Sequence, residues 1–230
     1  MELQQVVRAS DSEATSAETR ATVAALVTLA LAAVSWVLSI DRMDAMDMGV
    51  ATELGSLASF IVTWLLMMAA MMLPGAAPAV ARRARGDSSA LAVALFLGSY
   101  LAIWTLVGVG VYAVYEPHRT TIAGVLTIAA GLYELTLLKR TWRRCCSEAD
   151  LSGLRFGLFC VGSSAGLMLM FVAVGVMSIF WMALVAAAIV AQKLVRPIRV
   201  VDALLGLAIV GLGILIVLAP SAVPGVTPAM

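Results

Sequence analysis

Charge, histidine and cysteine are all scarce in this sequence. Only 13% of its 230 residues are charged, and it has one histidine and three cysteines. A single histidine excludes a haem held by a histidine pair, and it excludes a multi-histidine copper centre within this chain alone. Three cysteines make no fully paired disulfide framework. The net charge is +1 and the basic residues lie in short segments between apolar runs, so no basic face for nucleic acid is expected.

The common catalytic motifs are missing as well. The sequence has no glycine-rich phosphate loop, no H-E-x-x-H, and no serine, histidine and acid that the expected topology would bring together. Short segments of alternating apolar and polar residues, which a membrane barrel requires, are also absent. We therefore expect a chain that is not catalytic by itself.

Hydrophobic residues, in contrast, make up 62% of the chain, above the roughly 45–50% of soluble domains. Apolar runs of about 20 residues recur, each long enough to cross a hydrocarbon core of roughly 30 Å. The expected fold is all-α, a polytopic membrane helical bundle of about seven transmembrane helices. The runs predict spans at 21–40, 54–73, 90–115, 121–138, 156–174, 178–192 and 200–219.

The run 156–192 is divided because a single helix of that length would be about 55 Å long, too long for a bilayer. Basic residues also stand at both ends of the run, Arg155 before it and Lys193 after it, so an even number of crossings returns both ends to the cytoplasm. A cytoplasmic N-terminus then places all 15 basic residues except Arg42 and Arg119 in the cytoplasm, as the positive-inside rule requires. We expect a polar cytoplasmic tail (1–19), one transmembrane domain (20–219) and a short extracytoplasmic tail (220–230). The expected location is the lipid bilayer of the bacterial cytoplasmic (inner) membrane.

The stretch from Asp41 to Gly49, "DRMDAMDMG", lies outside the cytoplasm in this orientation. Thioethers prefer Cu(I), whereas carboxylates and imidazole also accept harder ions. The next loop on that side, "YEPHRT", holds the only histidine. The predicted outer metal site therefore comprises Met43, Met46, Met48, Asp44, Asp47 and His118. The alternative is that the methionines are interfacial hydrophobes and the aspartates keep the loop hydrated.

A second group of sulfur atoms lies in the predicted second span, in "WLLMMAAMMLPGAAP". Met67 and Met71 are four residues apart, as are Met68 and Met72, so each pair stacks along the helix. Their soft side chains suit Cu(I), and they equally suit gap filling in a core. Pro74 and Pro78 are expected to end the helix.

Two cysteines are expected near the cytoplasmic end of the bundle. Cys160 lies about one turn into the fifth span, and Cys146 lies in the basic segment "LKRTWRRCC". Flanking arginines favour the thiolate form that binds metal, although unligated loop thiols are the alternative. The weaker, inner metal candidates are therefore Met67, Met68, Met71, Met72, Cys146 and Cys160.

Glu134 is the only acid well inside a predicted span, and a buried membrane carboxylate is a functional candidate by default. Lys139 lies close enough in sequence to pair with it. The segment Gly162 to Gly166, "GSSAG", predicts close helix packing, with Ser163 and Ser164 bonding either across to another helix or back to the backbone. The last span carries no distinctive motif and is expected to face lipid or a partner subunit.

Three stretches carry a resemblance: "WLLMMAAMMLPGAAP", "GLYELTLLKRTWRRCC" and "FCVGSSAGLMLMFVAVGVMSIFWM". They resemble a bacterial family of predicted metal-binding integral membrane proteins that is often linked with copper handling. Such members usually carry C-L-x-x-C where this chain has Trp142 and Cys146, and further cysteines where it has Ser163 and Ser164. They have glutamine at the position of Glu134. The resemblance implies a divergent member with a depleted thiolate site.

Three functions follow from these observations. The first is non-catalytic copper handling, with capture outside and delivery to, or retention for, a membrane copper enzyme. The second is an accessory subunit of a multi-subunit membrane enzyme, such as a copper-dependent oxygenase or oxidase, that binds no metal itself. The third is a small-ion or metal transporter, the weakest because Glu134 is the only clear intramembrane charge and no matching broken helices appear. The expected partners are other membrane subunits or a copper enzyme, and the expected metal is copper.

Overall fold

The computed structural model describes residues 2–43, 54–86, 89–115, 119–146, 152–175, 178–194 and 199–223. Within these ranges the chain forms eight α-helices, a short 3-10 turn and no strand, so the predicted all-α fold is confirmed. The helices are α1 (Glu2–Met43), α2 (Leu57–Gly86), α3 (Ala90–Val114), α4 (Thr120–Glu134), α5 (Leu137–Cys146), α6 (Gly153–Gly175), α7 (Ile179–Leu194) and α8 (Arg199–Leu218), followed by the turn η2 (Pro220–Ala222).

Five of these helices are long and apolar enough to cross a membrane: α1 from Asp11 onward, α2, α3, α6 and α8. Helices α4 and α5 would add a sixth span if counted together, although their axes differ by 65°. Helix α7 is apolar but has only 16 residues. Seven spans therefore stay a prediction.

Two helices extend further than the sequence predicts. The polar residues before Asp11 continue α1 as helix. Pro74 and Pro78 lie inside α2, so the expectation that they end this helix is wrong.

The predicted span 121–138 is wrong at its C-terminal end. Helix α4 ends at Glu134, and α5 begins at Leu137 in a new direction. In a continuous helix, residues five apart lie about 140° apart around the axis, so Lys139 could not face Glu134. The bend brings the two buried side chains together as an ion pair. The division predicted near residue 175 is confirmed, since α6 ends at Gly175 and α7 begins at Ile179.

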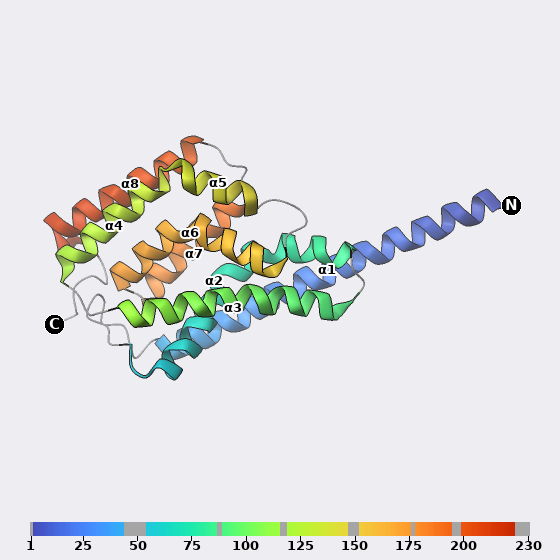
Figure 1. The fold of residues 1–230 in the computed structure, drawn as a ribbon, viewed down its shortest axis with the longest axis horizontal. Helices are drawn as coiled ribbons and strands as arrows, with labels where there is room; N and C mark the ends of the chain where they lie inside the picture. The colour runs from blue at the N-terminus through green and yellow to red at the C-terminus, as the bar shows by residue number, and fades with distance from the viewer. Residues whose placement is uncertain are drawn as a thin grey trace.

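The helices form two groups joined by a central pair. Helices α1, α2 and α3 pack together on one side, and α4 packs along α8 on the other. Figure 1 shows α6 and α7 between these groups, with α5 folded back beside α6. The largest buried side chains include Trp64 of α2 and Tyr100 and Trp104 of α3, and the ring of Tyr100 packs against Phe156 of α6.

Four glycines hold α4 and α8 in close antiparallel contact. A Cβ added at Gly213 would lie 2.8 Å from the carbonyl oxygen of Gly124, and one at Gly131 would lie 2.8 Å from that of Gly206. The same interval separates the two glycines on each helix, so both contacts lie along one seam. Small residues that let backbones approach are typical of membrane helix pairs. The expectation that α8 faces only lipid or a partner is therefore incomplete.

The seam predicts a contrast between two glycines of α8. Gly213→Ala should lower the free energy of unfolding by about 1–3 kcal/mol, because the new methyl group meets backbone that cannot retreat. Gly211 has nothing within 4 Å of an added Cβ, so Gly211→Ala should be neutral or stabilising by up to about 1 kcal/mol through helix propensity. Unfolding of both purified variants in detergent measures the difference. Equal effects would contradict the seam.

Candidate metal centre

Two cysteine thiols that are distant in sequence meet inside the bundle. Cys160 lies in α6 with no exposed surface, and Cys146 is the buried last residue of α5. Their thiols lie close enough to interact electrostatically, and neither is in a disulfide. Helix α5 reaches α6 because the chain turns sharply after Glu134. The bend at the end of α4 thus creates the thiol pair.

Two further polar groups surround the sulfur of Cys160. The ammonium of Lys193, in the last turn of α7, donates a hydrogen bond to Cys160 Sγ over 2.9 Å. The hydroxyl of Tyr100, fully buried in α3, lies 3.2 Å from the same sulfur. A cation beside a thiol favours its thiolate form. Four helices, α3, α5, α6 and α7, therefore each supply one group to this site.

Lys193 is held in place along its whole side chain. Its stem covers Gly75 of α2, where an added Cβ would collide with the lysine Cδ. Its ammonium lies 5.6 Å from the ring centroid of Phe156, within the range of a cation–π contact. The sequence marked Lys193 only as a basic residue after a span. Because it lies 33 residues from Cys160, no local spacing indicates that the two side chains meet.

The donor set of this site suits a soft ion. Among the residues that the structure describes, no three His, Cys, Asp or Glu side chains lie close enough to hold a metal ion together. Ions such as Mg²⁺ and Ca²⁺, which need several oxygen ligands, are not accommodated by such a set. Cu(I) prefers sulfur and is satisfied by a pair of thiolates. The thiol pair therefore fits Cu(I) by ligand type and number.

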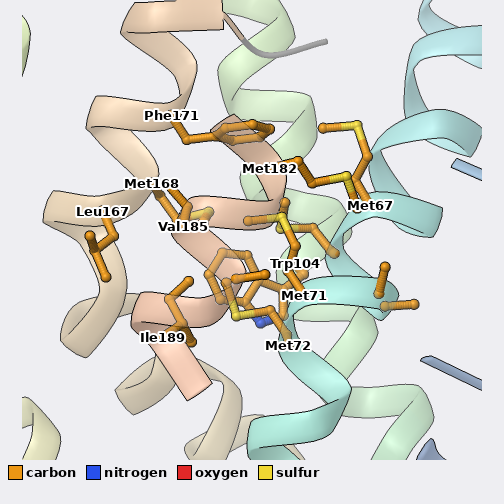
Figure 2. Close-up of a cluster of buried hydrophobic side chains, with 14 of the residues drawn as sticks. Met67, Met71, Met72, Trp104, Leu167, Met168, Phe171, Met182, Val185 and Ile189 are labelled. Carbon is orange, nitrogen blue, oxygen red and sulfur yellow. The ribbon is translucent and has the colours of Figure 1, made fainter. Parts of the chain in front are cut away.

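A buried cluster of methionines lies beside the thiol pair. Figure 2 shows Met67, Met71 and Met72 of α2, Met168 of α6 and Met182 of α7 gathered between the three helices, next to Trp104. We call these five residues the methionine cluster. The α2 methionines and Met182 have no exposed surface, and Met168 is 6% exposed. The sequence identified the α2 members and missed Met168 and Met182, for which "LMLMF" and "FWM" were the only signals.

Helix geometry connects the methionine cluster to the thiol pair. Met72 precedes Gly75, which Lys193 covers, by less than one turn of α2. Ile189 packs in the cluster and precedes Lys193 by about one turn of α7. Cys160 lies about two turns, roughly 12 Å, from Met168 along α6. The methionine cluster and the thiol pair therefore lie at neighbouring levels of the same helices.

The predicted outer site falls largely outside the described residues. Asp44, Met46, Asp47, Met48 and His118 belong to segments whose structure is not described. Met43 is the last residue of α1, and its side chain is fully buried in the hydrophobic core. That burial agrees with a packing role for this one methionine. The outer site as a whole stays a prediction.

Residues at the positions where the resemblance implies cysteines take packing roles here. Trp142 of α5 covers Gly162 of α6, where an added Cβ would lie 2.5 Å from the indole, and its ring stacks near Phe159. The hydroxyls of Ser163 and Ser164 both donate to the carbonyl oxygen of Cys160. The "GSSAG" segment therefore packs closely against its neighbours, as the sequence predicts.

Glu134 belongs to a second buried polar network on the same side. Its carboxylate pairs with Lys139, and Gln192 Nε2 donates to it over 3.0 Å. Arg143 pairs with Asp202 over 2.5 Å and donates to the carbonyl of Gln192. The pairing of Glu134 with Lys139 is confirmed. These contacts join α4, α5, α7 and α8, which fixes the helices that carry Cys146 and Lys193.

The fold and the site define an all-helical protein with several apolar, membrane-length helices and a buried sulfur-rich centre. The sequence profile of the PpoB2 family, described as copper chaperones, matches residues 61–216. That range is well over half of the chain, so the protein belongs to the PpoB2 copper chaperone family. No curated protein and no solved structure was found to be similar to it. The match supports a copper-handling role and includes both cysteines and the methionine cluster, but it begins after the "DRMDAMDMG" segment.

Proposed function

We propose that this chain is a membrane-embedded Cu(I) chaperone that holds copper between Cys146 and Cys160 and passes it to a membrane copper enzyme. The observation that carries the proposal is the burial of these two thiols on the packed helices α5 and α6, with the Lys193 ammonium 2.9 Å from Cys160. Both cysteines lie inside the segment that matches the copper chaperone family.

The surroundings of the thiol pair suit retention of a metal rather than its chemical use. Both cysteines are buried, and the neighbouring groups are an ammonium, a phenol and an aromatic ring. None of these groups is a general base placed to activate water or substrate. A chaperone needs sulfur ligands, protection from oxidation and a route for transfer, and the methionine cluster supplies soft ligands next to the pair.

The membrane location rests on the outer surface of the bundle. Helices α1, α3 and α8 expose large aliphatic side chains, such as Leu26 (59%), Leu106 (66%) and Leu207 (59%). Exposed apolar surface of this extent is unfavourable in water and suits a lipid bilayer. The basic residues of the chain cluster near the end that holds the thiol pair, which suits a cytoplasmic position for that end.

The "DRMDAMDMG" segment takes an accessory part in this proposal. Met46 and Met48 are soft ligands, and Asp44 and Asp47 attract cations through their negative charge. The family match begins beyond this segment, so copper capture there is a property of this chain rather than of the family core. His118 would add a nitrogen ligand from the neighbouring loop.

A second candidate function is an accessory subunit of a copper enzyme that binds no metal itself. The observation in its favour is Trp142, whose indole fills the position of a family cysteine and packs on Gly162. This function predicts that the purified chain has no affinity for copper, so a measurement of Cu(I) affinity separates the two candidates.

The test is Cu(I) affinity measured by competition with a coloured chelator. Cys146→Ser and Cys160→Ser should each lose the high-affinity Cu(I) that the wild-type chain binds, because one thiolate alone holds the ion weakly. Cys145 is the matched control, since it is adjacent and only partly exposed but has no part in the thiol pair. Cys145→Ser should bind like the wild type. High-affinity binding in the Cys146→Ser, Cys160→Ser double variant would contradict the site, and no binding by the wild type would favour the accessory subunit.

A further inference from the structure

A positively charged side chain contacts the thiol pair. Lys193 donates to the sulfur of Cys160, and its stem is fixed between Gly75 and Phe156. Lysines that enter a protein interior usually pair with carboxylates, whereas the hydrogen-bond partner of the half-buried Lys193 is a sulfur atom. The sulfur of Cys160 therefore lies against a fixed positive charge.

Ligand softness alone leaves the choice of metal open. Thiolates bind Cu(I), and they bind Zn(II) and Cd(II) as well. A chaperone that relied on two cysteines only would be exposed to divalent competitors. Some other property of the site must separate metals that share an affinity for sulfur.

We propose that Lys193 is a specificity-determining residue that makes the thiol pair select monovalent over divalent soft cations by charge. This inference rests on the proposed function. Two thiolates carry two negative charges, and Lys193 offsets one of them at contact distance. A monovalent ion then leaves this group neutral, whereas a divalent ion leaves an additional positive charge against the ammonium. In a buried site such a charge is costly because water cannot solvate it.

The geometry keeps this charge in place when metal enters. The methylene stem of Lys193 fills the space above Gly75, and helix α7 is tied to α5 through the contact of Arg143 with the carbonyl of Gln192. The ammonium therefore stays beside the sulfur atoms instead of withdrawing to solvent. One unit charge at about 4 Å and an effective dielectric constant of about 20 corresponds to a preference of roughly 100- to 1,000-fold.

The experiment compares Ag(I), a redox-inert monovalent probe, with Cd(II), a divalent probe of sulfur sites. Lys193→Gln keeps much of the side-chain volume, removes the charge and adds no sulfur ligand for Ag(I). It should lower the ratio of Ag(I) to Cd(II) affinity by about 100- to 1,000-fold. Tyr100→Phe is the matched control, because it removes a neutral hydrogen-bond partner from the same sulfur. It should change both affinities by a similar factor and keep their ratio.

Three outcomes are informative. A reduced ratio in Lys193→Gln, with the ratio kept in Tyr100→Phe and in Lys193→Arg, supports the selectivity. An unchanged ratio in Lys193→Gln, with binding of both ions still dependent on Cys146 and Cys160, overturns it and leaves the copper site intact. Binding of neither ion to the wild-type thiol pair overturns the proposed function itself. Helical circular dichroism and gel filtration of each variant identify misfolded protein, and Lys193→Leu replaces Lys193→Gln if the latter misfolds.

Discussion

Lys139→Met is expected to lower the free energy of unfolding by about 3–5 kcal/mol, because it leaves a buried carboxylate without its cation. Glu134 and Lys139 both have no exposed side-chain surface, and they pair directly. Without Lys139, only the amide of Gln192 remains to stabilise Glu134. The affected position is the bend between α4 and α5, so the loss should also loosen α5 and with it Cys146.

The control is the double variant Glu134→Gln, Lys139→Met, which removes both charges. It should recover most of the stability that the single variant loses, since neutral replacement of a buried pair is often neutral or stabilising. Thermal unfolding in detergent, followed by circular dichroism, measures all three proteins. A single variant as stable as the wild type would show that the pair does not hold the bend. Cu(I) affinity should fall in the single variant and return in the double variant.

Most of the helices could be predicted from the sequence because apolar runs of membrane length dominate it. The division between α6 and α7 followed from basic residues at both ends of one long run. The bend after Glu134 could not be predicted in this way, because hydropathy continues through Leu135, Leu137 and Leu138. It coincides with a buried ion pair between the end of α4 and the start of α5, which no hydropathy pattern reveals.

The candidate site, like the fold, could be predicted from the sequence only in part. Cys146 and Cys160 could be selected individually, since each is a sulfur atom near the cytoplasmic end of a predicted span. Their contact depends on the direction of α5 after the bend, which no local pattern encodes. Lys193 reaches Cys160 only because Gly75 leaves room for its stem. Likewise, the glycine spacing on α4 and α8 is visible in the sequence but gains meaning only when the two helices are known to be neighbours.

The methionine cluster leads to the second large expected effect, which concerns copper loading rather than stability. Replacing Met67, Met71, Met72 and Met182 by leucine should block most loading of the thiol pair from the outer side of a membrane. Leucine is close to methionine in volume, so the packing cost should be about 1.5 kcal/mol or less at each site. It offers no lone pair to a metal ion, so Cu(I) would face about two turns of helix without a ligand.

The measurement uses the chain reconstituted in lipid vesicles, with a Cu(I) chelate supplied on the side of the "DRMDAMDMG" segment. Labelling of the partly exposed Cys145 by an impermeant maleimide, in a separate sample, reports which way the chains face. Copper should reach Cys146 and Cys160 readily in the wild type and only slowly in the quadruple leucine variant. In detergent, where both ends of the bundle are accessible, the two proteins should load to the same final occupancy.

Comparing loading in vesicles with loading in detergent shows whether the four methionines conduct Cu(I) or only pack the core. A variant that loads poorly in detergent as well has lost the thiol pair through misfolding, which circular dichroism detects independently. A variant that loads as quickly as the wild type in vesicles shows that the methionines only fill the core. Slow loading in vesicles with full occupancy in detergent leaves one physical explanation. The thioethers of α2 and α7 then carry Cu(I) through the bundle, and the thiol pair beside Lys193 is where the ion stops.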